Sequence, residues 1–265
     1  MTFRLLRLRL KWTAGATVRF RAFAAANALR GGLGEILRTR GGDAFTRIFE
    51  PPPAENGPSG FKDPPRPFVI RAAHLNGATF EAGEKFHFDL HLFDTAPDLA
   101  TAALNAFAEL AAQQKAQQTA TIEPVSLDLK PPEIPITELL IAFETPTELK
   151  SGGVLSTVPE FGILYSRARD RVSTLRALYG DGHLPLNFAE TGHAAQAIQL
   201  VQGDLQIRQA TRTSGRTGQT HPLGGFVGKA HYRGDCTQFV GILKAAEWTG
   251  VGTKTVWGNG QIRLL

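Results

Sequence analysis

The sequence predicts an α+β protein built from two tandem ferredoxin-like (βαββαβ) domains, each an antiparallel sheet with its helices on one face. Three observations support this fold class. The two halves of the chain give the same order of strand and helix patterns, a proline-rich segment separates them, and 265 residues with 42% hydrophobic content can form two cores. The other face of each sheet has no helix of its own, so a ligand can lie there.

The N-terminal half begins with a strand pattern of period two, in which apolar and basic residues alternate. The apolar residues are Leu6, Leu8, Leu10 and Trp12, and the basic ones are Arg7, Arg9 and Lys11. The other elements expected here are a helix at 19–38, strands at 68–73 and 85–94, a helix from Pro97 and a strand at 121–130. Gly31, Gly32 and Gly34 are expected either to break the first helix or to allow unusually close packing.

The strand at 85–94 carries polar side chains at alternate positions. We expect His87, Asp89 and His91 to face outward, while the phenylalanines and leucines between them face the core. Alternate strand residues lie roughly 6–7 Å apart, which is close enough to share a metal ion. A solvated polar face is the commoner outcome of this pattern, so no metal or cofactor is predicted.

The C-terminal half repeats the order after the stiff, proline-rich linker at 130–135. Strands are expected at 136–144, 205–213, 225–232 and 255–265, helices at 160–179 and 236–248, and a partly helical insertion at 186–201. We therefore predict an N-terminal domain at 1–130 and a C-terminal domain at 136–265. The helix at 160–179 carries Arg167, Arg169, Arg171 and Arg176, whose spacing spreads them around the helix and favours solvated positions.

Composition narrows the class of partner. The net charge of +5 and the pI of about 9.6 favour a polyanion. The single cysteine, Cys236, excludes a disulfide framework and a cysteine-based zinc site, and predicts a reducing, cytoplasmic location. No run of 18 or more apolar residues is present, so we predict no membrane span.

The sequence lacks the motifs of several enzyme classes. The chain has no tight Asp/Glu cluster of the kind that holds two cations in metal-dependent nucleases. It has no G-x-S-x-G nucleophile motif. Gly224–Lys229 is one residue short of a phosphate loop, and Ala230 replaces the hydroxyl residue that would bind Mg²⁺.

Basic and glycine-rich segments remain. The polar loop at 211–221 contains Arg212, Arg216 and His221 and no acidic residue, which suits a phosphate backbone or a strained RNA turn; a polar hairpin tip is the alternative. Near the C-terminus, Gly250, Gly252, Gly258 and Gly260 surround Thr253, Lys254 and Thr255. This segment is interpreted either as tight turns or as a flexible loop whose bare N–H groups, hydroxyls and ammonium bind phosphate.

Six segments resemble the CRISPR-associated endoribonucleases that process repeat RNA, within the repeat-associated mysterious protein superfamily. They are LRGGLGEILR at 29–38, PPRPFVIRAAHLNG at 64–77, AGEKFHFDLHLFD at 82–94, FETPTELKSGG at 143–153, FGILYSRARDRVSTLRALYG at 161–180 and GGFVGKAHYRGDCTQFVGILKAAEWTGVGTKTVWGNGQIRL at 224–264. The last is the most specific, because it resembles the family's C-terminal signature with its glycine-rich loop. The family's fold, two ferredoxin-like domains in tandem, agrees with the order of elements given above.

The resemblance implies that the protein cuts a CRISPR precursor transcript within each repeat, without a metal. In this reaction the substrate's own 2′-hydroxyl attacks the adjacent phosphate and leaves a 2′,3′-cyclic phosphate and a 5′-hydroxyl. Such chemistry needs a base, an acid and a cation for the growing phosphorane charge. Histidine suits the first two roles near neutral pH.

The sequence departs from the commoner family pattern, since many relatives place a histidine on or just after the first helix and this chain has none before His74. We expect Arg38 or Arg40, near the glycine-rich loop, to stabilise the transition state, and His221 to supply the imidazole. The RNA-binding residues expected are Arg7, Arg9, Lys11, Arg212, Arg216, Lys229, Gly250, Gly252, Lys254, Gly258 and Gly260.

An alternative function stays open at this point. The missing early histidine would also suit a non-cleaving subunit that holds guide RNA in a CRISPR effector complex. The partners expected are therefore CRISPR repeat RNA and, for the alternative, other effector subunits, with no membrane.

Overall fold

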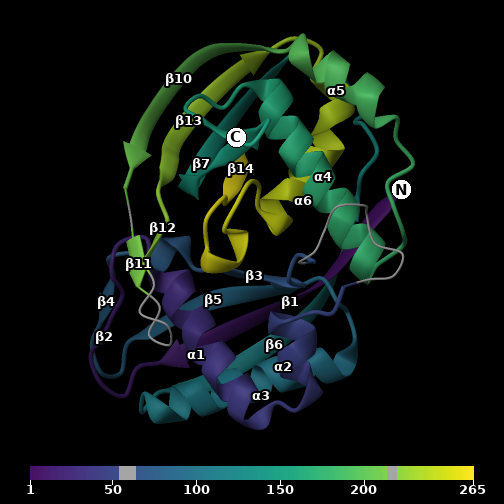
Figure 1. The fold of residues 1–265 in the computed structure, drawn as a ribbon. Helices are drawn as coiled ribbons and strands as arrows, with labels where there is room; N and C mark the ends of the chain where they lie inside the picture. The colour runs from purple at the N-terminus through teal and green to yellow at the C-terminus, as the bar shows by residue number, and fades with distance from the viewer. Residues whose placement is uncertain (54–63, 210, 214–219) are drawn as a thin grey trace.

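Two four-stranded antiparallel sheets form the framework, as the computed structural model shows (Figure 1). The structure describes residues 1–53, 64–209, 211–213 and 220–265, and at 211–213 and 220–222 only the backbone. The strand orders are β3-β5-β1-β6 and β10-β13-β7-β14. When only the four strands of each sheet are numbered in chain order, both sheets have the order 2-3-1-4. Every pairing in them is antiparallel, which is the ferredoxin-like arrangement. The predicted fold class is confirmed.

The first sheet is covered on one face by helices α1 and α3. Its elements are β1 (Thr2–Thr13), α1 (Ala25–Arg40), α2 (Asp43–Phe49), β3 (Phe68–Arg71), β5 (Lys85–Leu92), α3 (Pro97–Gln113) and β6 (Gln117–Asp128). Leu8, Leu10 and Trp12 of β1 are buried in the same core as the apolar residues of α1 and α3. The period-two pattern therefore identified the core face of β1 correctly.

The first helix differs from its prediction at both its start and its interior. It begins at Ala25 rather than residue 19, because β2 (Val18–Arg19) pairs with β4 (Thr79–Phe80) in a small ladder of its own. The helix then runs unbroken through its three glycines. A Cβ at Gly32 would lie 2.5 Å from Cδ2 of Leu110, so this glycine allows α1 and α3 to approach closely.

The second sheet packs against α4 and α6. Its half contains β7 (Glu138–Thr147), β8 (Leu149–Ser151), β9 (Val154–Ser156), α4 (Phe161–Tyr179), α5 (Phe188–Gln196), β10 (Gln199–Arg208), β11 (Thr211–Thr213), β12 (Thr220–Pro222), β13 (Gly225–Arg233), α6 (Val240–Thr249) and β14 (Ile262–Leu264). The predicted strand at 255–265 is wrong at its start: residues 255–257 form a 3₁₀ turn, η3, and only 262–264 pair with β7. The predicted strand at 205–213 begins earlier, at Gln199.

The helix-free face of the first sheet is divided between two environments. At one end Phe3, Leu5 and Phe93 belong to the core of the second half, where Leu164 and Val172 of α4 also lie. Further along β5, Asp89 and His91 are 8% and 6% exposed, so the expectation that both face solvent is wrong. They are buried because the second half packs against this face.

At the C-terminal end of α6, several polar contacts join the two halves. Three cationic or imidazole side chains donate to its last carbonyls: Arg71 Nη2 to Glu247 O (2.5 Å), His91 Nδ1 to Trp248 O (3.0 Å) and Arg171 Nε to Thr249 O (2.8 Å). The last carbonyls of a helix have no partner within it and carry partial negative charge. Two of the three donors come from the first sheet, so these bonds hold α6 against it.

Burial gives His91 a testable pH signature. Desolvation, followed by the charge of Arg71, lowers the pKa of His91 to about 3; Asp89 and the Trp248 carbonyl oppose this shift and Arg9 adds to it. The unfolded chain protonates this imidazole below its ordinary pKa of about 6.5, whereas the folded protein keeps it neutral. The contribution of His91 to the free energy of unfolding should therefore be fully present above pH 6.5. It should be lost progressively as the pH falls toward the folded-state pKa of about 3.

We expect acidification from pH 6.5 to pH 5 to remove about 1–2 kcal/mol through this group alone, since one pKa unit corresponds to about 1.4 kcal/mol. Denaturant unfolding at several pH values measures it. His91→Gln should flatten the pH dependence between 5 and 6.5. An unchanged pH dependence in that variant would show that His91 is not the responsible group.

The glycines of α1 offer a second test. Gly31 has nothing within 4 Å of a Cβ built on it, so Gly31→Ala should raise helix stability by up to about 1 kcal/mol. Gly32→Ala must displace the Leu110 side chain and should not give this gain. Urea midpoints of the two variants compare them directly, and equal stabilisation by both would contradict the close α1–α3 contact.

Candidate functional site

The glycine-rich loop at 250–260 is anchored to its surroundings rather than free. The Val251 N–H donates to Gly260 O (2.9 Å), the Gly260 N–H to Pro146 O (3.0 Å) and the Thr253 N–H to Glu148 O (3.1 Å). The first bond closes the loop on itself, and the other two fix it on Pro146 of β7 and on Glu148, so at these three positions the N–H groups are used within the protein.

Two of the loop's glycines are required by close approach as well as by φ. A Cβ at Gly252, where φ is +78°, would lie 2.2 Å from Glu148 O. A Cβ at Gly258, where φ is +94°, would lie 2.5 Å from Cβ of Ala26 in α1. Side chains rarely adopt such φ values and have no room here. At these positions glycine lets the loop pack onto both halves of the protein.

Lys254 is held by an acidic neighbour. Its Nζ lies 2.6 and 2.7 Å from the two carboxylate oxygens of Glu148, whose side chain is only 10% exposed. The Thr253 hydroxyl donates to the same carboxylate at 2.7 Å. The structure therefore gives Lys254 a structural partner, and of the predicted phosphate-binding residues whose side chains are described it is the least available.

The loop meets the first helix at Arg30 rather than at the predicted arginines. Cζ of Arg30 lies 5.9 Å from the ring centroid of Trp257 and 5.2 Å from that of Phe49. Arg38 and Arg40 lie eight and ten residues further along α1, roughly 12–15 Å away at 1.5 Å per residue. They form ion pairs with Glu35 (2.7 Å) and Glu109 (2.9 Å), so the expected position of both beside the loop is wrong.

The hairpin of β11 and β12 is joined to the same loop. Asn259 Nδ2 donates to Leu223 O at 2.9 Å, which fixes the end of the hairpin on the glycine-rich loop. His221 and Arg212 are paired in the ladder, but their side chains lie outside what the structure describes, and Arg216 lies outside the described residues. His221 is therefore two residues before Leu223, whose carbonyl is held by Asn259.

A stacked histidine pair, which the sequence did not predict, lies on the exposed part of the first sheet. The ring centroids of His74 and His87 are 4.7 Å apart with an interplanar angle of 30°. His74 Nε2 donates to the His87 carbonyl at 2.8 Å. Because a carbonyl only accepts, neutral His74 carries its lone pair on Nδ1. The strand pattern placed His87 only with its neighbours in sequence, and the pairing depends on the turn η1 (Ala73–Leu75), which the sequence did not reveal.

The turn that carries His74 borders the glycine-rich loop. Ala73 and Asn76, which flank His74 in the chain, line a small hollow together with Trp257, Gly258 and Asn259. Desolvation, then the charges of His74, Arg9 and Lys11, lower the pKa of His87, while Asp89 opposes them. A lowered pKa keeps His87 neutral near pH 7, as a general base requires.

Basic side chains line the same face of β1. Lys11 is exposed and stands opposite His87 in the sheet register. Arg7 and Arg9 share the carboxylate of Asp89, at 2.9 and 2.8 Å, and Arg7 also lies 3.5 Å from the exposed carboxylate of Glu123. The set His87, Asp89 and His91 does not form a metal centre, since Asp89 is engaged by arginines and His91 by Trp248. Among the described residues no group of three or more potential ligands is placed to hold a metal ion.

Lys229 occupies the helix-free face of the second sheet. It is exposed on β13, between Ala142 of β7 and Asp204 of β10 in the register. His231, two residues along β13, is held by Glu138 at 3.1 Å. This face is thus more mixed in charge than that of β1.

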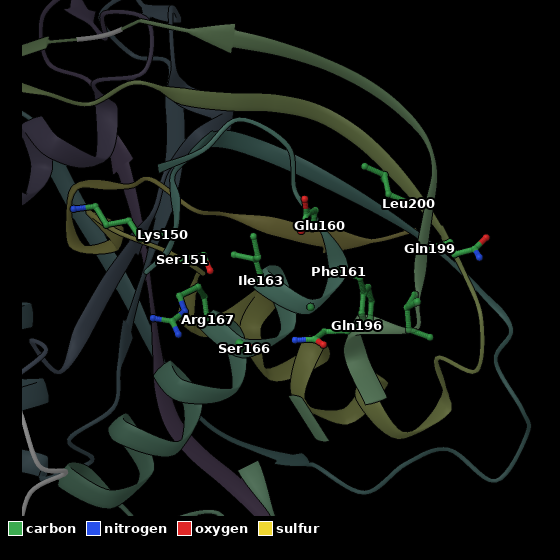
Figure 2. Close-up of a pocket in the computed structure, with 12 residues that line it drawn as sticks. Lys150, Ser151, Glu160, Phe161, Ile163, Ser166, Arg167, Gln196, Gln199 and Leu200 are labelled. Carbon is green, nitrogen blue, oxygen red and sulfur yellow. The ribbon is translucent and has the colours of Figure 1, made fainter. Parts of the chain in front are cut away.

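A separate hollow of about 490 Å³ lies at the start of α4 (Figure 2). Its lining combines Lys150, Arg167, Ile163 and Gln196 with residues of β10. It contains no histidine, so it lacks the imidazole that the chemistry of cleavage requires.

Comparisons with known proteins agree with this architecture. Residues 141–262 match the family model described as CRISPR-associated endoribonuclease Cas6, and residues 3–138 match one described as an N-terminal domain. No curated protein matches the chain. Helices long and apolar enough to cross a membrane are lacking in the described part of the chain.

Solved structures show the same fold at low identity. Thermus thermophilus Cas6 (TTHB231) is 15% identical with a TM-score of 0.60, over 100% of this chain and 99% of that one. Its product complex is 16% identical with a TM-score of 0.61, over 98% and 100%. A chain of a partial Cas6-RT-Cas1–Cas2 complex is 12% identical with a TM-score of 0.64, over 99% of this chain and 46% of that one.

The fold of tandem ferredoxin-like halves, together with the family-model match over residues 141–262, identifies the class of protein as a CRISPR-associated endoribonuclease. The chain belongs to the CRISPR-associated repeat-RNA-processing endoribonuclease family. The predicted family is confirmed.

The Glu148–Lys254 pair leads to a third prediction. Lys254→Met leaves a nearly buried carboxylate without its cation and should lower the free energy of unfolding by about 1–3 kcal/mol. Glu148→Gln should cost a similar amount, and the double variant less than the sum. A denaturant double-mutant cycle measures this coupling. Weaker RNA binding by Lys254→Met with unchanged stability would instead identify Lys254 as a phosphate ligand.

Proposed function

We propose that the protein cleaves CRISPR precursor RNA within its repeats, without a metal ion, and leaves 2′,3′-cyclic phosphate and 5′-hydroxyl ends. Membership of the repeat-RNA-processing family supports the substrate. The single observation that supports the chemistry best is the stacked pair of His74 and His87 on a basic sheet face, where Ala73, the residue before His74, borders the glycine-rich loop.

The reaction needs one proton removed and one supplied. A neutral imidazole, His74 at Nδ1 or His87, accepts the proton of the 2′-hydroxyl while O2′ bonds to phosphorus. The bond from phosphorus to O5′ breaks, and a second imidazole, in its protonated form, donates its proton to the departing oxygen and becomes neutral. His221, in the hairpin anchored at Leu223, is the other candidate for either role. Lys11 and Arg9 stand opposite His87 and Asp89 and stabilise the charge that develops on the phosphorane.

The remaining predicted residues take binding roles in this proposal. Lys229, on the second sheet, and Arg212 and Arg216, in the hairpin segment, contact phosphates of the repeat RNA. Arg7, which Asp89 and Glu123 hold in place, contributes with Arg9 on the same face of β1. Gly250, Gly252, Gly258 and Gly260 shape the loop on which the RNA lies. Arg38 and Arg40, at the far end of α1, are proposed to contact flanking RNA rather than the cleaved phosphate.

Single-turnover cleavage of the cognate repeat RNA in EDTA tests the proposal. Wild-type protein should make one cut with a cyclic-phosphate end. His74→Ala, His87→Ala and His221→Ala each remove one imidazole, and loss of a general acid or base should slow cleavage by about 10²–10⁴-fold. RNA affinity should change little.

The matched control is His193→Ala, which removes an exposed histidine from α5 and should cleave normally. A rate that stays at the wild-type level in both His74→Ala and His87→Ala would exclude the stacked pair. Binding without any cut by wild-type protein would favour a non-cleaving guide-RNA subunit. A requirement for added metal would contradict the proposed chemistry.

A further inference from the structure

A basic hollow of about 240 Å³ shares Lys150 and Arg167 with the hollow of Figure 2 and lies between α4 and the beginning of the glycine-rich loop. Its lining comes from four parts of the chain that are distant in sequence. The lining residues are Pro65, Lys150, Arg167, Asp170, Arg171, Thr174, Gly252 and Thr253. It thus holds three cations, one carboxylate and two hydroxyls.

Arg171 is the most unusual member of this set. Its place in the helix pattern favoured a solvated position, yet its Nη2 is buried and has no hydrogen-bond partner among the described residues. Its Nε is used by Thr249 O at 2.8 Å. Burial, and then the nearby charge of Arg71, lower the pKa of Arg171 to about 9, and no carboxylate offsets them. A guanidinium buried without an acid is costly unless an anion compensates it.

The other groups face the same hollow from around its rim. Arg167, Asp170, Arg171 and Thr174 follow one another at the i, i+3, i+4 and i+7 spacing that places residues on one face of α4. Asp170 is already shared between Arg167 (3.0 Å) and Arg169 (2.9 Å), so it does not neutralise Arg171. Figure 2 shows the nitrogen ends of Lys150 and Arg167 at the same end of the view. The charge that remains is positive and favours an anion.

We propose that this hollow binds a phosphate group of the RNA chain, away from the phosphate that is cleaved. The proposal rests on the proposed function for the identity of the RNA. Gly252 and Thr253 border the hollow, whereas Trp257 to Asn259, at the other end of the same loop, share a hollow with Ala73, the residue before His74. One RNA strand that crosses the loop therefore meets both places. The guanidinium of Arg171, the ammonium of Lys150 and the Thr174 hydroxyl bind the phosphate oxygens.

The test uses a double variant that spares the buried arginine. Lys150→Ala with Arg167→Ala removes two cations that donate no hydrogen bond to the backbone in the described structure, so the fold should persist. Binding of the cognate repeat RNA should weaken at low salt. The slope of log affinity against log salt should decrease by about 0.7 for each phosphate of a single strand that the variant fails to neutralise.

The matched control is Arg4→Ala with Lys130→Ala, which removes the same charge from exposed positions outside the hollow. A parallel measurement follows thermal unfolding in inorganic phosphate at constant ionic strength. Phosphate should raise the unfolding temperature of wild-type protein and of the control, because a ligand that binds the folded state stabilises it. It should have little effect on the Lys150/Arg167 double variant.

Each outcome either supports or overturns the proposed phosphate site. Loss of both phosphate stabilisation and RNA affinity in the double variant alone supports the proposal. Loss of phosphate stabilisation with normal RNA binding overturns the assignment to RNA and leaves a site for another phosphate ligand. Equal behaviour of the double variant and the control overturns the site. Failure of wild-type protein to bind repeat RNA overturns the proposed function, and the phosphate measurement then decides on the hollow separately.

Discussion

The last carbonyls of α6, which have no partner within the helix, are the constraint on which the arrangement of the two halves depends. A helix that ends against another domain must find donors for its last carbonyls, or bury them at a cost of about 1–3 kcal/mol each. Here Arg71, His91 and Arg171 provide them, from the first sheet and from α4. Because the glycine-rich loop starts at the next residue, Gly250, these bonds also determine where that loop begins.

The loop itself then acts as a joint between the halves. Glu148 holds Thr253 and Lys254, Asn259 holds the hairpin at Leu223, and Gly258 lies against α1. The histidine pair, the hairpin and the basic face of β1 are thereby placed relative to one another by contacts on the second half. The site is consequently a property of the whole chain, since each half alone lacks part of it.

The fold was predictable from the sequence because hydrophobic periodicity is a local signal, and β1, β5, α3 and α4 all follow it. The boundaries that were missed depend on tertiary pairing: residues 18–19 pair with 79–80, and 255–257 turn to reach α1. The site was predicted less well. Charge pattern identified the basic face of β1 but not its pairing with Asp89. Glycine density was compatible both with tight turns and with access for a ligand, and much of it serves close packing. The stacking of His74 on His87 and the burial of Arg171 both depend on contacts between distant segments.

The apolar end of the first sheet has a consequence for synthesis on the ribosome. Phe3, Leu5 and Phe93 are covered by a core to which α4, residues 161–179, contributes. The first sheet can form once β6, which ends at Asp128, has left the ribosome. Its apolar end then stays exposed to solvent until α4 has been synthesised and packs on it. Nascent chains at that stage are prone to stick to one another or to recruit chaperones. Slow translation between residues 128 and 179 would prolong this exposure, so the order of folding favours rapid passage through that interval.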